Sequence, residues 1–109
     1  EEEIIIRNQI KPDFYSYFNY LNTLKVDGDF SAFFKTYEDL HRDVETYIER
    51  KSKESLKSYV QNTKGRKFFG NFKDLEKLMS IEKYAPIHDQ EHLDELYHSI
   101  VKIYSEIMN

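Results

Sequence analysis

The sequence predicts an all-α protein, a single-domain bundle of four to five helices with a short N-terminal arm. Three observations lead to this fold class. Apolar side chains recur at three- and four-residue spacing in each long segment, which is typical of amphipathic helices. The connections between these segments are short, which favours antiparallel neighbours in a bundle. Nine Tyr and eight Phe among 109 residues are too many for a disordered chain, and this length suffices for one domain core.

The expected domain spans residues 12–109, and the arm spans residues 1–11. The arm reads EEEIIIRNQIK and ends at Pro12, and the residue before a proline disfavours helical dihedral angles. Its three consecutive isoleucines, Ile4 to Ile6, have no helical period. We therefore interpret this segment as an arm that packs on the bundle or is contributed to a partner.

The first helix is expected over residues 12–24, because Pro12 suits a first helical turn and Asp13 suits the positive end of a helix. A turn follows, since Gly28 tolerates a positive φ. The second helix begins at Asp29, a favourable N-cap residue. The apolar stripes consist of Phe14, Tyr17, Phe18, Leu21 and Leu24 in the first helix, and of Phe30, Phe33, Phe34, Tyr37, Leu40, Val44, Tyr47 and Ile48 in the second.

The second stripe is interrupted at residues 51–55 and resumes at Leu56. One continuous helix over residues 29–62 would be about 50 Å long. A domain of about 100 residues, by contrast, has a radius of gyration of about 13 Å. We therefore expect a break or a bend at residues 51–55, and the alternative is a helix that protrudes from the bundle.

The C-terminal half is expected to contain two more helices. Residues 62–67 lack apolar side chains and include a glycine, which predicts a loop or a frayed helix end. A helix follows over residues 68–79 or beyond and ends before Pro86. Asp89 caps the last helix, which runs to about Ile107. The expected buried residues are Leu75, Leu78 and Met79 in the former helix, and Leu93, Leu96, Tyr97, Ile100, Val101, Ile103, Tyr104, Ile107 and Met108 in the latter.

Two Glu-x-x-His pairs, Glu38–His41 and Glu95–His98, have the spacing that carboxylate-bridged di-iron bundles use. At about 100° per residue, Glu95 and His98 fall on the solvent side of the last helix, away from the bundle core. His41 lies beside an apolar stripe and is expected to be a core-edge histidine bonded to water or to a neighbour. We therefore predict no metal site.

The sequence offers no catalytic constellation. The chain has no Cys, and hence neither thiol catalysis nor a Cys-ligated metal centre. It contains neither a Gly-rich phosphate loop nor a Gly-x-Ser-x-Gly elbow. His88 and His92 are expected to be surface side chains. We predict that the protein has no catalytic residues and no cofactor and is not an enzyme. The lack of Cys fits any cellular compartment, and we favour an intracellular location.

Charge is distributed unevenly along the chain, although the net charge is only −4. Residues 50–77 carry nine Lys or Arg and three Asp or Glu, and both flanking segments are acidic. Either the basic segment packs beside its acidic neighbours, or it faces an acidic partner. Basic and aromatic residues interleave over residues 64–73, which suits single-stranded nucleic acid or an anionic membrane surface; alternatively, the aromatic residues anchor a loop to the core. The candidate residues for nucleic-acid or anion binding are Lys53, Lys57, Lys64, Arg66, Lys67, Phe69 and Lys73.

The nine tyrosines exceed what a bundle core needs. Tyr15, Tyr20 and Tyr84 fall at the edges of the stripes or outside them, which is typical of interfaces or of half-buried boundary positions. With Ile4 and Ile5 they are the candidate partner-binding residues. We predict a non-catalytic helical interaction module, an adaptor, scaffold or assembly module that binds another protein or itself. The alternative is nucleic-acid or anionic-surface binding through residues 50–73. No apolar run is long enough to predict a transmembrane segment.

Overall fold

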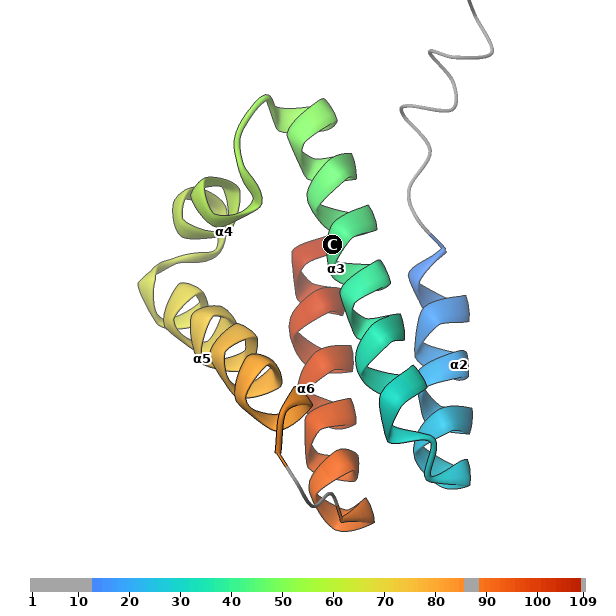
Figure 1. Cartoon of the computed structure of the whole chain (residues 1–109). Coiled ribbons are helices and arrows are strands. Elements are labelled where there is room, and N and C mark those ends of the chain that lie inside the picture. Colours follow the sequence, from blue (N-terminus) through green and yellow to red (C-terminus); the bar gives the residue numbers. More distant parts are fainter. Residues whose placement is uncertain (1–12, 86–88, 109) are drawn as a thin grey trace, which may run out of the picture.

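The computed structural model describes residues 13–85 and 89–108 and confirms the all-α bundle (Figure 1). The N-terminal arm, with Ile4 and Ile5, lies outside the described residues, as does His88. Within the described ranges every regular element is a helix. The five helices are α2 (Phe14–Asp27), α3 (Phe30–Ser52), α4 (Leu56–Lys64), α5 (Arg66–Lys83) and α6 (Gln90–Met108).

Helices α3 and α6 form the centre of the bundle (Figure 1). Helix α2 packs against both of them on one side, antiparallel to each. Helix α5 packs against both on the other side, and α4 bridges α3 and α5. The bundle therefore has two flanks, α2 on one and α4 with α5 on the other.

The core runs through the middle of the bundle and takes side chains from all five helices. Each fully buried Leu, Ile, Val or Phe side chain stabilises a folded protein by about 1.5–3 kcal/mol. Most residues of the expected stripes lie in this core, so the helical periodicity identifies them correctly. The largest fully buried side chains are Tyr104, Phe33, Phe72, Leu21, Leu40, Ile48, Leu56, Leu93, Leu96, Ile100, Ile107 and Val44.

The caps expected at Asp29 and Asp89 are confirmed, since their carboxylates accept backbone N–H bonds from Ala32 and His92. Asp13 caps α2 in the same way, and its hydrogen bonds from Ser16 hold the pKa of its carboxyl below the usual range. Gly28 ends α2 in the left-handed region with φ of 73°. Helix α2 continues to Asp27, one turn beyond the expected end.

The expected break after residue 50 is confirmed. Helix α3 ends at Ser52, and Lys53 adopts the left-handed region with φ of 63°. Ser55 then caps α4 by accepting the backbone N–H of Ser58. A left-handed conformation costs a non-glycine residue about 1 kcal/mol, so the polar caps on either side of Lys53 help to hold the chain in this bend.

Two expectations about α4 and α5 are wrong. Of the two alternatives for residues 62–67, the loop is wrong, because residues 62–64 are the end of α4 and Gly65 alone, with φ of 94°, turns the chain directly into α5. Leu78 is not buried but 38% exposed. The buried line of α5 runs through Phe72, Leu75 and Met79, and Leu78 projects about 90° away from that line around the helix.

No helix in the described part of the chain is both long enough and apolar enough to cross a membrane.

Candidate functional site

A groove of about 490 Å³ lies between α5 and α6. Its floor is apolar, whereas its rim carries amide, hydroxyl and charged groups. A volume in the range of about 300–1,000 Å³ is typical of sites that bury a ligand. The lining residues are Phe68, Asn71, Asp74, Leu75 and Leu78 from α5, and Ser99, Lys102, Ile103 and Glu106 from α6.

Helical spacing places the lining residues of the groove on one side of each helix. The residues of α5 that line it follow one another at intervals of three or four, so they share one flank of the helix. The lining residues of α6 do the same. Asn71 and Ser99 are short side chains at this contact, so they leave a hollow that longer apolar side chains would fill.

Exposed apolar side chains continue from the groove along the C-terminal half of α5. Leu78, in the groove wall, is 38% exposed, and Ile81, one turn later, is 56% exposed. Tyr84, directly after α5, is 77% exposed but lies at a pocket between α3 and α5, away from this groove. Apolar groups that border a hollow in this way are typical of surfaces that bind another protein.

The two helices that form the groove carry opposite charges on their exposed faces. Helix α5 exposes five cationic residues and one anionic residue, and α6 exposes three anionic residues and one cationic residue. Lys83 of α5 pairs with Glu38, and none of the other side chains forms an ion pair with another described residue. The residues are Arg66, Lys67, Lys73, Lys77, Lys83 and Asp74 on α5, and Glu91, Glu95, Glu106 and Lys102 on α6.

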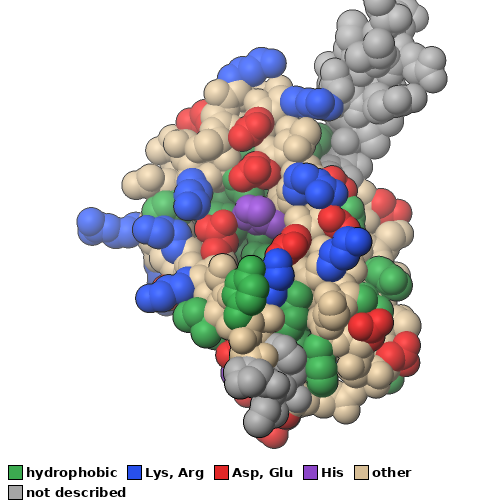
Figure 2. Space-filling model, viewed as in Figure 1, with side chains coloured by type: hydrophobic (Ala, Val, Ile, Leu, Met, Phe, Trp, Pro, Cys, Tyr) green, Lys and Arg blue, Asp and Glu red, His purple; other side chains and the backbone are tan. Residues whose placement is uncertain are grey.

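The predicted nucleic-acid or anion-binding residues extend over α4, α5 and the connection from α3 to α4. Figure 2 shows Lys and Arg side chains gathered along the edge where α4 and α5 lie. Lys64, Arg66 and Lys67 surround the turn at Gly65, whereas Lys53 lies at the opposite end of α4. Lys57 is exposed on α4, and Lys73 Nζ lies 5.5 Å from the centre of the Phe69 ring. Within the described ranges, no carboxylate pairs with any of these lysines or with Arg66.

The structure does not bring the three candidate tyrosines together. Tyr15 and Tyr20 are exposed on α2, but they project about 140° apart around that helix. The ring of Tyr15 lies against Phe14, with 4.7 Å between the ring centres. Tyr84 follows α5, on the other side of the central helices. These residues therefore do not form one binding surface.

A buried polar chain links α3 to α6, and the sequence did not predict it. The hydroxyl of Tyr104 lies 2.9 Å from that of Tyr37 and 2.7 Å from His41 Nδ1. Burial raises the pKa of Tyr37 to about 12 and that of Tyr104 well above its usual value. Both hydroxyls therefore stay protonated at neutral pH. The one signal was the position of His41 beside the stripe, and its bond to a neighbour confirms the core-edge interpretation.

A smaller pocket of about 210 Å³ opens over this chain between α3 and α5. His41 Nε2 lies 3.5 Å from a carboxylate oxygen of Glu76. Lys83, also at this pocket, pairs with Glu38, and this hydrogen bond raises the pKa of Lys83. No three His, Asp or Glu side chains of residues 13–85 and 89–108 are grouped so that they could hold a metal ion. The charged groups here already have protein partners, so this pocket has less to offer a ligand than the α5–α6 groove.

Neither models of known protein families, nor curated proteins, nor solved structures give a match to this chain.

Proposed function

We propose that this chain is a non-catalytic helical interaction module that binds a segment of a partner protein in the α5–α6 groove. The observation that carries the proposal is the apolar floor of this groove, with Leu78 and Ile81 exposed beside it. A helix or an extended peptide that lays an apolar face into such a groove is a common mode of protein recognition.

The composition of the groove supports this mode of binding. Leu75 and Ile103 are buried beneath it and belong to the core, so the floor is held rigidly in place. Asp74, Lys102 and Glu106 border it and can fix the register of a bound segment. An apolar side chain that enters such a groove gains about 1.5–3 kcal/mol from burial, so three anchors contribute about 5–9 kcal/mol toward the roughly 8 kcal/mol that micromolar affinity requires.

The test is a selection from a displayed peptide library at nanomolar chain concentration. We expect the selected peptides to share apolar residues at three- and four-residue spacing. Leu78→Glu should weaken their binding at least about tenfold, because it places a charge in the apolar wall. Val26→Glu is the matched control, since Val26 is exposed on α2, far from the groove.

Circular dichroism and urea unfolding establish that both variants fold. The proposal is wrong if no peptide is enriched, or if Leu78→Glu and Val26→Glu bind the selected peptides equally well.

A second candidate function, binding to nucleic acid or another anionic surface, is favoured by the exposed cations of α4 and α5. Its test is the fluorescence anisotropy of a labelled single-stranded oligonucleotide. Affinity should fall at least about tenfold between about 50 and 200 mM salt. The double variant Arg66→Glu/Lys67→Glu should abolish binding, whereas Lys35→Glu/Lys102→Glu, at exposed positions outside this region, should weaken it much less. Equal losses in the two variants would exclude a defined site.

A further inference from the structure

We infer that the outer face of α5 binds the surface of an anionic lipid bilayer. The inference rests on the second candidate function, in which the cations of α4 and α5 bind an anionic partner, and it names that partner. It comes from three features: the position of the α5 cations, an exposed isoleucine beside them, and the burial of the aromatic rings that a nucleic acid would need.

The cations of α5 lie on one ridge. The ridge consists of the exposed residues Arg66, Lys73, Lys77 and Ile81. Their intervals of seven, four and four residues place them within an arc of about 80° at about 100° per residue. This arc projects about 130–170° away from the buried line of Phe72, Leu75 and Met79. The ridge is therefore the outermost part of α5, and its side chains can meet a flat surface together.

The ridge and its surroundings are strongly basic. The three ridge cations have no carboxylate partner within the described ranges, and Lys67 adds a fourth unpaired cation on α5. Asp74 is the one exposed carboxylate of this helix. Lys57 and Lys64 lie on α4, which shares the same edge of the bundle (Figure 2). Clusters of about four to eight Lys and Arg residues are typical of surfaces that bind anionic lipid headgroups.

Ile81 favours a bilayer over a nucleic acid. Its side chain is 56% exposed, one helical turn beyond Lys77, and it does not line the α5–α6 groove. Tyr84, which is 77% exposed, lies at the same end of α5. A phosphate backbone gives such side chains nothing to pack against. The interface of a bilayer, by contrast, takes up apolar and aromatic side chains that lie beside cations.

The phenylalanines of the basic segment are not available to stack on bases. Phe72 is fully buried, and Phe68 and Phe69 are partly buried and pack against the core. Lys73 Nζ also lies over the Phe69 ring. Single-stranded nucleic acid is held by rings that stack on successive bases. Residues 64–73 offer cations but no fully exposed ring, which suits lipid headgroups better than bases.

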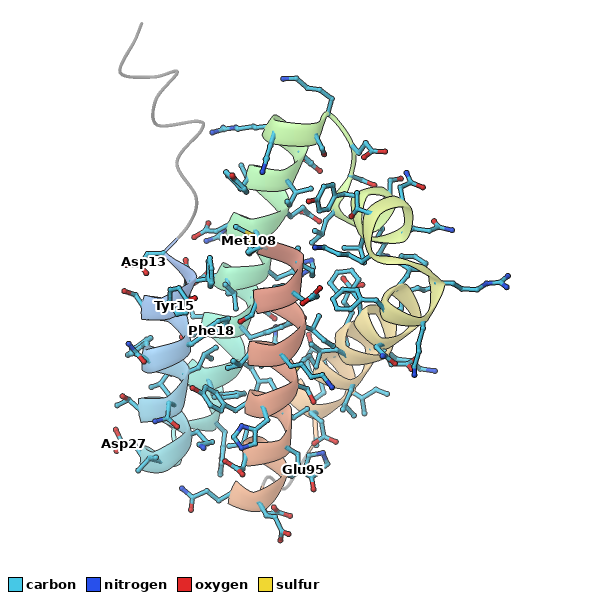
Figure 3. All side chains as sticks on the ribbon, turned by 180° about the vertical axis from the view of Figure 1, so that it is seen from behind. Asp13, Tyr15, Phe18, Asp27, Glu95 and Met108 are labelled. Carbon is cyan, nitrogen blue, oxygen red and sulfur yellow. The ribbon has the colours of Figure 1, made fainter. Side chains whose placement is uncertain are left out.

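The acidic part of the molecule does not oppose this contact. Figure 3 shows α2, with Asp13 and Asp27 labelled at its two ends, at the opposite edge of the bundle from α4 and α5. Both carboxylates are exposed, and the central helices, each about 10 Å wide, separate them from the ridge. Exposed charges are screened beyond about 10 Å at about 0.1 M salt. The net charge of −4 therefore does not keep the ridge from an anionic surface.

The test is flotation of the full chain with vesicles of phosphatidylcholine and phosphatidylserine, and with vesicles of phosphatidylcholine alone. We expect binding to the anionic vesicles only. Lys73→Glu/Lys77→Glu should weaken this binding at least about tenfold, because each cation near an anionic surface contributes about fivefold. Lys35→Glu/Lys102→Glu is the matched control, with the same change in net charge at exposed positions outside the ridge, and it should lose much less.

A second measurement follows the position of Ile81 in the bilayer. The chain contains no Trp, so Ile81→Trp places a single tryptophan on the ridge. Val26→Trp is the matched control, since Val26 is 63% exposed on α2. On anionic vesicles the emission of Ile81→Trp should shift to shorter wavelength as the ring enters the interface, and brominated lipids should quench it. The emission of Val26→Trp should stay unchanged.

Several results would overturn the inference. A chain that does not bind anionic vesicles at about 0.1 M salt has no lipid-binding face. Equal losses in the two double variants would show that net charge alone governs binding. An unchanged emission of vesicle-bound Ile81→Trp would show that the ridge does not enter the bilayer.

The oligonucleotide titration and the peptide selection separate this inference from the proposed functions. Binding to the oligonucleotide without binding to vesicles would assign the cations to nucleic acid, so the second candidate function would stand and the inference would fail. Binding to neither would exclude both. The peptide selection decides separately on the groove, because Lys73, Lys77 and Ile81 do not line it.

Discussion

The two flanks of the bundle are packed to different degrees. Helix α6 buries seven of its 19 side chains. Helix α2, on its outer side, is linked to α3 by a hydrogen bond that the Tyr17 hydroxyl donates to Asp43, and to α6 by the ion pair of Lys25 with Asp94. Helix α5, nearly as long, buries only Phe72, Leu75 and Met79. Among the exposed cations of α4 and α5, Lys83 pairs with Glu38, and the others have no carboxylate partner within the described part of the chain.

This difference shows how one bundle can provide both stability and a binding surface. Polar pairs join α2 to α3 and to α6, and the buried polar chain joins α3 to α6. Helix α5 is held by one line of buried residues and, toward α3, by the pairs of Lys83 with Glu38 and of Glu76 with His41, so its other flank remains available to a partner. The following predictions test whether this division is correct.

The largest expected effect is that of a core truncation in α6. Ile100→Ala should lower the free energy of unfolding by about 2–5 kcal/mol, because Ile100 is fully buried between the two flanks. Leu78→Ala on α5 should cost less than about 1 kcal/mol in the monomer, since its side chain is already partly in water. Urea unfolding of both variants measures the two costs. Similar losses would mean that the two flanks are equally packed.

The stability should also fall at alkaline pH. Burial raises the pKa of Tyr37 and that of Tyr17 to about 12, and it also raises the pKa of Tyr104 well above its usual value. These groups hold their protons more tightly when folded than when unfolded, so their contribution is complete below pH of about 10 and is lost as pH rises through about 12. For Tyr37 alone the loss is about 2–3 kcal/mol.

The urea midpoint, followed from pH of about 9 to 12, gives this dependence. In Tyr104→Phe the fall should be shallower, because one of the three hydroxyls is gone. A flat profile in the unaltered chain would show that the polar chain is open to water.

The ion pair of α2 with α6 should have a smaller effect. Lys25→Met should cost about 1 kcal/mol, because Lys25 is largely buried, pairs with Asp94 and lies over the ring of Tyr97. Lys57→Met on α4 should be neutral, since Lys57 is exposed. Thermal unfolding of both variants measures the difference. A loss in Lys57→Met as large as in Lys25→Met would contradict the view that the exposed cations of α4 are free for a partner.

The smallest expected effect is a gain in stability within α5. Gly70→Ala should stabilise the protein by about 0.5–1 kcal/mol, because Gly70 lies inside the helix and an added Cβ meets nothing within 4 Å. Gly65→Ala is the matched contrast and should destabilise, because the φ of Gly65 is +94°. If both changes destabilise equally, the turn between α4 and α5 does not depend on a left-handed residue.

The sequence predicts the helices well because helical periodicity is a local property. The stripe from Phe33 to Ile48 and the cap residue Asp29 identify α3, and the interruption at residues 51–55 correctly predicts where it ends. The conformation of the chain at Gly65 is not determined by such a local pattern. A glycine between polar residues suits a loop as well as a one-residue turn, and only the packing of α4 on α5 decides between them.

The groove and the polar chain could not be predicted from helical periodicity. Periodicity indicates which side of a helix is apolar, but it does not indicate which helix covers that side. Phe68 and Ile103 meet in one groove, and His41 meets Tyr104 across 63 residues of sequence. The expected burial of Leu78 was wrong for the same reason, because α6 covers only one flank of α5.

The central position of α6 also has a consequence during protein synthesis. Helices α2 to α5 leave the ribosome first, yet the inner faces of α2 and α5 both pack against a helix that has not been made. At about 5–20 residues per second, the 19 residues of α6 follow within seconds. During that interval Leu21 and Phe72 lack part of their cover. A nascent chain arrested before residue 90 should therefore bind chaperones and resist compaction, and the addition of α6 should release it.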